Sequence, residues 1–166
     1  MSQQRAKSKT KPNFDLPVIG WREWLVMPDL GIKFIKAKID TGARSSSLHA
    51  FDMSFSDRDG QRWVNFRVCP IQRNQSWVVE ASAPVLETRQ VRSSSGESQW
   101  RPVIKTPVVV MGLQFEIEVT LADRNQMGFR MLLGREAVRR RFLVAPGDSY
   151  LGGIPKRRRP SDGHRD

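Results

Sequence analysis

Alternation of apolar and polar residues at every second position is the feature that most limits the fold of this chain. In FIKAKID (residues 34–40) apolar residues alternate with Lys36 and Lys38, and QFEIEVTLA (residues 114–122) repeats the pattern. A period of two turns one side of a segment toward a core and the other toward water, which is typical of a half-buried strand. The pattern therefore predicts a chain built mainly from β-strands.

Turn signals separate these segments, and TPVVVMGLQFEIEV (residues 106–119) is predicted to be a hairpin that turns at Met111-Gly112. One segment, MLLGREAVRRRFLV (residues 131–144), runs from an apolar strand through Gly134 into a stretch of helical composition at 135–141 and back to an apolar strand. We therefore expect an all-β barrel or sandwich with one short helix near its C-terminal end. The other turn signals are Pro28-Asp29, Asp59-Gly60 and Ser93-Ser94-Ser95-Gly96.

Positive charge is concentrated at the two ends of the chain. Residues 1–12 carry four Lys or Arg and no acid, and residues 155–166 carry five against two Asp, so seven of the eleven net positive charges lie there. Lys, Arg, Ser, Pro and Gly dominate both ends, which predicts flexible tails over residues 1–14 and 154–166 around one domain at 15–153. Such tails attract RNA or another polyanion without specificity.

Several classes of site are excluded by what the sequence lacks. It has no Gly-x-x-x-x-Gly-Lys-Ser/Thr loop, and His49, His164 and Cys69 are too few for a zinc centre, so we expect no metal and no cofactor. A Ser-His-Asp site would have to use His49, but the Gly-x-Ser-x-Gly elbow is missing. One Cys, no apolar segment near the N-terminus and no long apolar run predict a cytoplasmic protein that does not enter a membrane.

The segment IDTGARSSSLHA (residues 39–50) places Asp40 in a turn directly after an alternating strand. Two interpretations are open: Asp40 caps its own turn, or it is a carboxylate that activates water. Gly42 allows the sharp turn, and the Thr41 hydroxyl is able to hold it rigid. Hydrolysis of a peptide by carboxylates needs a pair, and no second Asp-Thr/Ser-Gly exists in the sequence. A catalytic Asp40 therefore requires a second copy of the chain.

Four segments in order carry a resemblance to a known family: DTGARSSSLHA, VRSSSGESQWRPVI, LADRNQMGFRMLLGRE and FLVAPGDSYL. Together they span about residues 17–152 and resemble the retropepsin-like aspartic peptidases. The chain is more similar still to the bacterial, RimB-like branch that is often labelled "ATP-dependent zinc protease". The resemblance implies an acid-protease fold, which is a closed β-barrel with one short C-terminal helix. It also implies a homodimeric aspartic endopeptidase with one Asp-Thr-Gly in each subunit.

The resemblance also implies roles for individual residues. Asp40 would be catalytic, with the partner's Asp40 completing a pair around one water. The hairpin from Val91 to Arg101 would be a flap over the substrate, with Ser94 and Gly96 at its tip. The remaining assignments are Thr41, Gly42 and Ala43 for the active-site turn, which interlocks with its partner, and Leu132, Leu133 and Gly134 for support from behind the turn.

Arginines near the turn and the flap suggest either substrate binding or a structural role: Arg44, Arg92, Arg101 and Arg135. Viral retropepsins have Asp where this chain has Arg44, so we hypothesise either an ion pair between Arg44 and Glu136 or a contact of Arg44 with substrate. Some members of the bacterial branch are encoded near ligases that add glutamates to protein tails, which implies an acidic, glutamate-rich peptide substrate. The alternatives are a non-catalytic basic β-barrel that binds RNA or a ribosomal surface, and an inactive scaffold.

Overall fold

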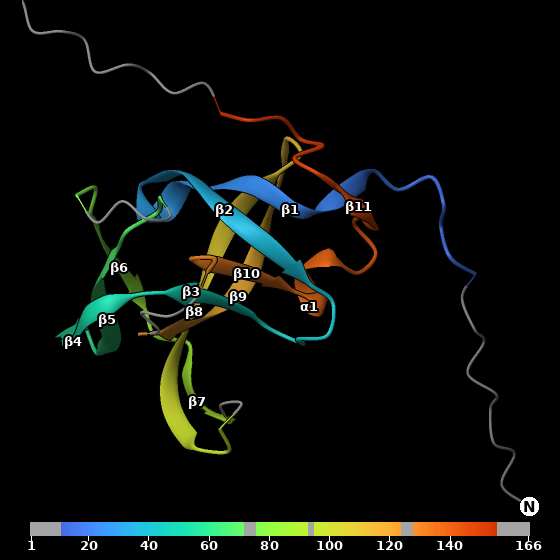
Figure 1. Ribbon diagram of the computed structural model, residues 1–166. Helices are drawn as coiled ribbons and strands as arrows, with labels where there is room; N and C mark the ends of the chain where they lie inside the picture. The colour runs from blue at the N-terminus through green and yellow to red at the C-terminus, as the bar shows by residue number, and fades with distance from the viewer. Residues whose placement is uncertain (1–10, 72–75, 93–94, 124–127, 156–166) are drawn as a thin grey trace, which may run out of the picture.

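A computed structural model describes residues 11–71, 76–92, 95–123 and 128–155 of the 166-residue chain. These residues form strands with a one-turn α-helix and a 3-10 turn, as the alternating pattern predicts (Figure 1). The elements are β1 (Val18–Met27), η1 (Pro28–Leu30), β2 (Ile32–Asp40), β3 (Ser46–His49), β4 (Phe51–Arg58), β5 (Gln61–Val68), β6 (Val79–Pro84), β7 (Glu87–Arg92), β8 (Ser98–Val110), β9 (Leu113–Ala122), β10 (Met131–Gly134), α1 (Arg135–Val138) and β11 (Leu143–Ser149).

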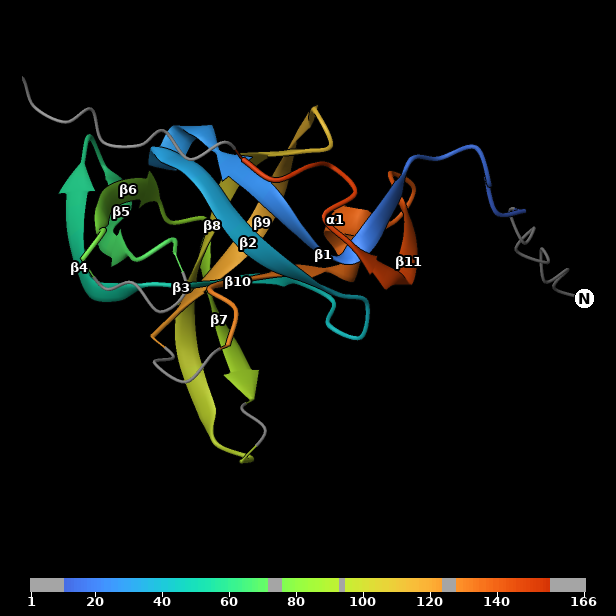
Figure 2. The same cartoon turned by 45° about the horizontal axis from the view of Figure 1, so that its top comes forward.

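Six strands of the described chain close into a barrel. The larger sheet has the order β11-β1-β2-β10-β3-β9-β8-β7, and a further pairing of Val26 with Val109 joins β1 to β8 and closes the ring. Two strands lie outside it: β11 runs parallel to the first half of β1, and β7 extends β8 into a hairpin. In Figures 1 and 2 this hairpin projects away from the barrel. A separate sheet of β4, β5 and β6 lies at the side.

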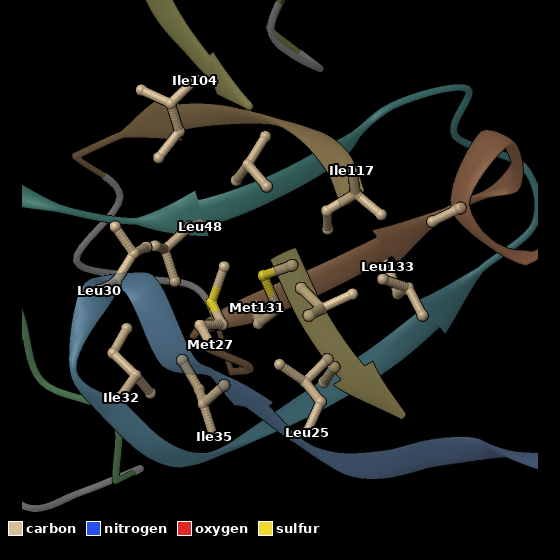
Figure 3. Packing of buried hydrophobic residues seen from close by; sticks show 14 of the residues in the cluster. Leu25, Met27, Leu30, Ile32, Ile35, Leu48, Ile104, Ile117, Met131 and Leu133 are labelled. Atoms are coloured by element: carbon tan, nitrogen blue, oxygen red, sulfur yellow. The ribbon is translucent and has the colours of Figure 1, made fainter. Parts of the chain in front are cut away.

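Side chains at every second position of the strands fill the barrel. Ile35, Ala37 and Ile39 of β2 are buried, as their alternation with lysines predicts. Figure 3 shows their neighbours on the other strands, including Leu48 of β3 and Met131 and Leu133 of β10, in one cluster. Burying a side chain of this size stabilises the fold by about 1.5–3 kcal/mol, so the alternation is the main determinant of this architecture.

The segment around α1 differs from its prediction in length. A helix was expected over residues 135–141, whereas α1 ends at Val138. Arg140 adopts a left-handed backbone with φ of 64°, and the N–H groups of Arg141 and Phe142 both donate to the Val138 carbonyl, 3.1 Å each. This tight reversal returns the buried Phe142 to the core and starts β11 beside β1.

Candidate active site

Asp40 lies at the end of β2, where that strand is paired in parallel with β10. The register places Gly134 opposite Asp40. The other edge of β10 pairs with β3 in the antiparallel sense, with Leu132 opposite Ser47. Thus β2 and β3 follow each other in the chain but are separated in the sheet by β10. Residues 41–45 must therefore cross the end of β10 to connect them.

Backbone hydrogen bonds from residues 134–136 hold this crossing loop. The N–H of Arg135 donates to the carbonyl of Ala43 at 2.7 Å, and that of Glu136 donates to the carbonyl of Arg44 at 3.0 Å. Both N–H groups belong to the first turn of α1, where no partner exists within the helix. The buried N–H of Gly134 donates to Ser46 Oγ at 3.0 Å. Three consecutive donors therefore hold the loop and the start of β3 from one side.

Gly134 has no room for a side chain. A Cβ at this position would lie 2.5 Å from the carbonyl carbon and oxygen of Ser45 and 2.9 Å from the nitrogen of Ser46. The loop therefore rests directly on the glycine backbone. At Gly42 a Cβ would make only an ordinary contact, 3.5 Å from Asp40 Oδ1, so close approach by a second copy remains a prediction for that residue.

The carboxylate of Asp40 is held at one oxygen. Oδ1 accepts a hydrogen bond of 3.2 Å from the N–H of Ala43, and the same N–H lies 3.2 Å from the Asp40 carbonyl. This is the bond expected of an Asp that caps its own turn. Oδ2 accepts no hydrogen bond within the part of the chain that the structure describes. Asp40 is half-buried and Thr41 and Gly42 beside it are exposed, so capping leaves one oxygen available at the tip of the loop.

The other predicted support residues divide between two roles. Leu133 is fully buried and packs in the core below the loop, whereas Leu132 is half-buried on the opposite, outer face of β10. The guanidinium of Arg135 donates from Nη1 to the carbonyl of Thr41 at 3.1 Å. The side chain of Arg135 therefore also helps to hold the loop in place.

The predicted flap corresponds to the hairpin of β7 and β8. Arg92 and Ser98 are the last paired residues before its tip, where Gly96 adopts a positive φ of 85°. Ser94 lies outside the described residues. Arg92 is exposed, but Arg101 is only 7% exposed, at the base of the hairpin opposite Arg89. Arg92 and Arg101 therefore occupy different environments.

Arg44 lines a polar pocket of about 500 Å³ beside the loop, α1 and β9. Arg89, which the sequence analysis missed, lies in the same pocket and pairs with Glu87 and with Glu118, the latter at 3.1 Å. The hydrogen bonds that Arg89 donates to the Glu87 carboxylate are the main cause that raises the pKa of Arg89. Only strand pairing brings these groups together, so no local sequence signal marks Arg89. The remaining charged lining residues are Glu116, Glu136 and Arg141.

The hypothesised ion pair between Arg44 and Glu136 is absent within the described chain, so this form of the hypothesis is wrong. The Glu136 carboxylate instead meets Arg139, three residues later, at 3.3 Å. Because α1 is a single turn, residues three apart lie on one face and close this pair. Arg44 and Glu136 meet only through their backbones. A pair between two copies, or a contact of Arg44 with substrate, stays a prediction.

His49 lies on β3 and is 2% exposed. Burial lowers its pKa from the usual 6.5, and the nearby positive charge of Arg130 lowers it further. Its ring stacks on Phe51 with 6.2 Å between centroids. These contacts are those of a packed core residue.

Two further kinds of feature are absent from the part of the chain that the structure describes. Among residues 11–71, 76–92, 95–123 and 128–155, no three His, Cys, Asp or Glu side chains gather closely enough to hold a metal ion. No helix in the same ranges is long and apolar enough to cross a membrane.

The sequence matches a family model described as "RimB-like: Retropepsin-like aspartic endopeptidase RimB" over residues 18–154. The chain belongs to the RimB-like family. This match confirms the predicted resemblance, and with the six-stranded barrel and one short helix it confirms the predicted fold.

This RimB-like chain is also similar to one part of longer proteins. The chain is 45% identical over 140 residues to a protein of Desulfotalea psychrophila and 46% identical over 138 residues to one of Parasynechococcus marenigrum, both named "Probable alpha-L-glutamate ligase". The matches cover 84% and 82% of this chain but about 30% of each relative's length. A crystal structure of a Legionella pneumophila protein of unknown function has the same fold, with a TM-score of 0.66, 23% identity and coverage of 82% of this chain and 98% of that one.

Proposed function

We propose that this protein is an aspartic endopeptidase that works as a homodimer, with Asp40 of each copy sharing one water molecule. One carboxylate takes a proton from the water, which attacks the peptide carbonyl carbon. The other carboxyl group is protonated and donates its proton to the carbonyl oxygen. The resulting tetrahedral intermediate collapses when the first carboxyl group passes the proton from the water to the peptide nitrogen, which leaves as an amine. The second carboxylate takes a proton back from a hydroxyl of the intermediate, so the pair regains its starting protonation.

The geometry of the Asp40 carboxylate is the observation that carries this proposal. Its Oδ1 is fixed by the N–H of Ala43 while Oδ2 has no hydrogen bond among the described residues. The loop that bears it is tied to the backbone of Gly134, Arg135 and Glu136. Catalysis by a positioned carboxylate depends on such preorganisation, because a group held in place pays no reordering cost during the reaction.

Dimerisation follows from the number of carboxylates. The chain carries one Asp-Thr-Gly, so the second member of the pair must come from another copy. Thr41 and Gly42 are exposed at the tip of the loop, where a second loop would meet them. A two-fold axis through this point would bring the two Asp40 side chains face to face and place a hairpin of β7 and β8 on each side.

The proposed substrate is an acidic protein tail, including one extended by glutamates. The relatives from Desulfotalea and Parasynechococcus are named as glutamate ligases, and this chain is similar to about 30% of each. A ligase of that kind would form the bonds that this protein hydrolyses. Arg44 and Arg92 are exposed on the loop and the hairpin, which supports a substrate that carries negative charge.

The test compares the wild type with the Asp40→Asn variant on a glutamate-extended peptide and on its glutamine counterpart. We expect Asp40→Asn to lower kcat by about 10⁴-fold or more, because the pair acts as a unit. The variant should elute as a dimer in size-exclusion chromatography. Asp59→Asn is the matched control, since Asp59 also precedes a glycine but lies in the turn that joins β4 and β5 of the separate sheet.

Three results would contradict the proposal. The first is full activity of Asp40→Asn. The second is activity that a chelator removes, which would indicate a metal-dependent reaction. The third is ATP-dependent addition of glutamate to the peptide without hydrolysis, which would indicate that this segment shares the reaction named for its longer relatives.

A further inference from the structure

A row of side chains crosses the outer face of the sheet beside Asp40. The strand register pairs Lys38 with Leu132, Leu132 with Ser47, and Ser47 with Thr120. Paired residues of neighbouring strands point to the same face, and residues two apart in one strand do so as well. Lys38 therefore shares its face with Asp40, and the row begins about 7 Å from the proposed catalytic residue.

The opposite face of the same strands is the core, which fixes the direction of this row. Leu48 and Leu133, next to Ser47 and Leu132 in sequence, are fully buried and appear inside the cluster of Figure 3. A residue that neighbours a core residue in a strand must point away from the core. The row therefore lies on the outer face of the sheet, the face that it shares with Asp40.

The polar side chains of this row have no hydrogen-bond or ion-pair partners among the described residues. Lys38 is exposed and Ser47 is half-buried, and neither makes a hydrogen bond or ion pair within the described residues. Thr120 is only 3% exposed, yet its hydroxyl has no hydrogen-bond partner there either. A buried hydroxyl without a partner is costly in a folded protein unless a ligand or water satisfies it.

Between these polar groups lies Leu132, which is half-buried and apolar. Along the row an ammonium group is followed by an aliphatic surface and then by a hydroxyl group. This order of groups is complementary to a glutamate side chain. Two methylenes of such a side chain would rest on Leu132 while its carboxylate reaches the ammonium of Lys38 or the hydroxyl of Ser47. A glutamine of the same shape would lose the ion pair.

We propose that Lys38 is the residue that selects an acidic side chain next to the scissile bond. The proposal rests on the peptidase function and names the group that reads its substrate. Of the arginines that the resemblance singles out, Arg44 lines a pocket that also holds three glutamates, Arg135 donates to the Thr41 carbonyl, and Arg101 is buried at the base of the hairpin. Lys38 combines exposure, a place on the face of Asp40 and freedom from any carboxylate partner in the described chain.

The experiment measures kcat/KM for peptides that carry either Glu or Gln on each side of the cleaved bond. We expect Lys38→Gln to lower kcat/KM for the Glu peptide by about tenfold or more, the effect of losing a hydrogen bond to a charged group, and to leave the Gln peptide within about twofold. Lys38→Glu should prefer a Lys peptide. Lys33→Gln is the matched control, because Lys33 is an exposed lysine of the same strand about 23 Å from Asp40.

A structural role for Lys38 would lower activity on both peptides equally, and that result would overturn the proposal. So would a Glu preference that Lys38→Gln leaves unchanged. Binding of the uncleaved peptides to the Asp40→Asn dimer, measured by calorimetry, separates this inference from the peptidase function. If the wild type hydrolyses neither peptide but binding of the Glu peptide still depends on Lys38, the peptidase function fails and the acidic-side-chain site stands.

Discussion

Replacing Gly134 by Ala tests whether the loop that carries Asp40 is held by direct backbone packing. The added Cβ would meet the carbonyl carbon of Ser45 at 2.5 Å, whereas carbon atoms in contact normally lie about 3.5–4.0 Å apart. The obstacle is backbone rather than the end of a flexible side chain. The loop must therefore move by about 1 Å or more, and this movement breaks the bond from the Gly134 N–H to Ser46 Oγ.

Two costs follow from that movement. Overpacking a core typically costs about 1–3 kcal/mol, and a buried N–H left without a partner costs about 1–3 kcal/mol. We expect the free energy of unfolding to fall by about 2–5 kcal/mol, measured by urea denaturation with tryptophan fluorescence. Where peptidase activity is measured, a displacement of about 1 Å at the catalytic group should lower kcat by about 10²-fold.

Gly147→Ala provides the matched control, because a Cβ there meets no atom within 4 Å and the backbone φ is not positive. That variant should stay within about 1 kcal/mol of the wild type, or gain slightly, because alanine restricts the unfolded chain. Ser46→Ala removes the hydrogen-bond acceptor without adding bulk and should reproduce only the smaller part of the loss. A Gly134→Ala protein as stable and as active as the wild type would refute the argument that the loop rests on the glycine.

Two further predictions concern buried polar groups. Glu23 is 1% exposed, and its carboxylate accepts hydrogen bonds from the N–H groups of Gly20 (2.8 Å), Leu151 (3.0 Å) and Gly152 (2.8 Å). Glu23→Gln should therefore lower the free energy of unfolding by about 1.5–3 kcal/mol and speed amide exchange at Leu151 and Gly152. The control Glu116→Gln, at an exposed glutamate, should change both quantities little. Burial lowers the pKa of His49 below 6.5, so as the pH falls the unfolded chain takes up a proton at this side chain before the folded chain does, and stability should decline below about pH 6.5. His49→Gln should lose that part of the pH dependence. Equal pH profiles of the two proteins in urea denaturation would disprove the assignment.

Local chemistry accounts for the parts of the fold that the sequence analysis predicted correctly. Alternation over FIKAKID and QFEIEVTLA corresponds to β2 and β9, because each strand buries one side in the barrel. The hairpin of β8 and β9 turns at Met111 and Gly112, which both adopt positive φ, 53° and 75°. Two such residues form the turn whose twist matches paired strands. The signal for each of these features lies within a few residues of chain.

Features that depend on pairing between distant segments were not predicted. The separate sheet of β4, β5 and β6 has the same short strands and turns as the barrel, so its sequence does not indicate which sheet it joins. The end of α1 is set by the return of Phe142 to the core and not by helical propensity, since residues 139–141 are good helix formers. Strand register decides the surroundings of the candidate site in the same way. Lys38 lies beside Leu132 only because β2 pairs with β10, and Arg89 reaches Glu118 only because β7 and β9 both pair with β8.

The position of β10 in the sheet explains why the loop that carries Asp40 takes its shape from the barrel. Because β10 fills the gap between β2 and β3, the chain leaving Asp40 has to pass over the end of β10 before it enters β3. Closing the barrel therefore forces residues 41–45 into a tight crossing. The first N–H groups of α1 donate hydrogen bonds to the backbone carbonyls of this crossing loop. Only glycine at 134 permits that contact. The carboxylate at the start of the crossing is thus positioned by the folding of the sheet itself, and the proposed catalytic pair requires only that a second chain meet the first at this loop.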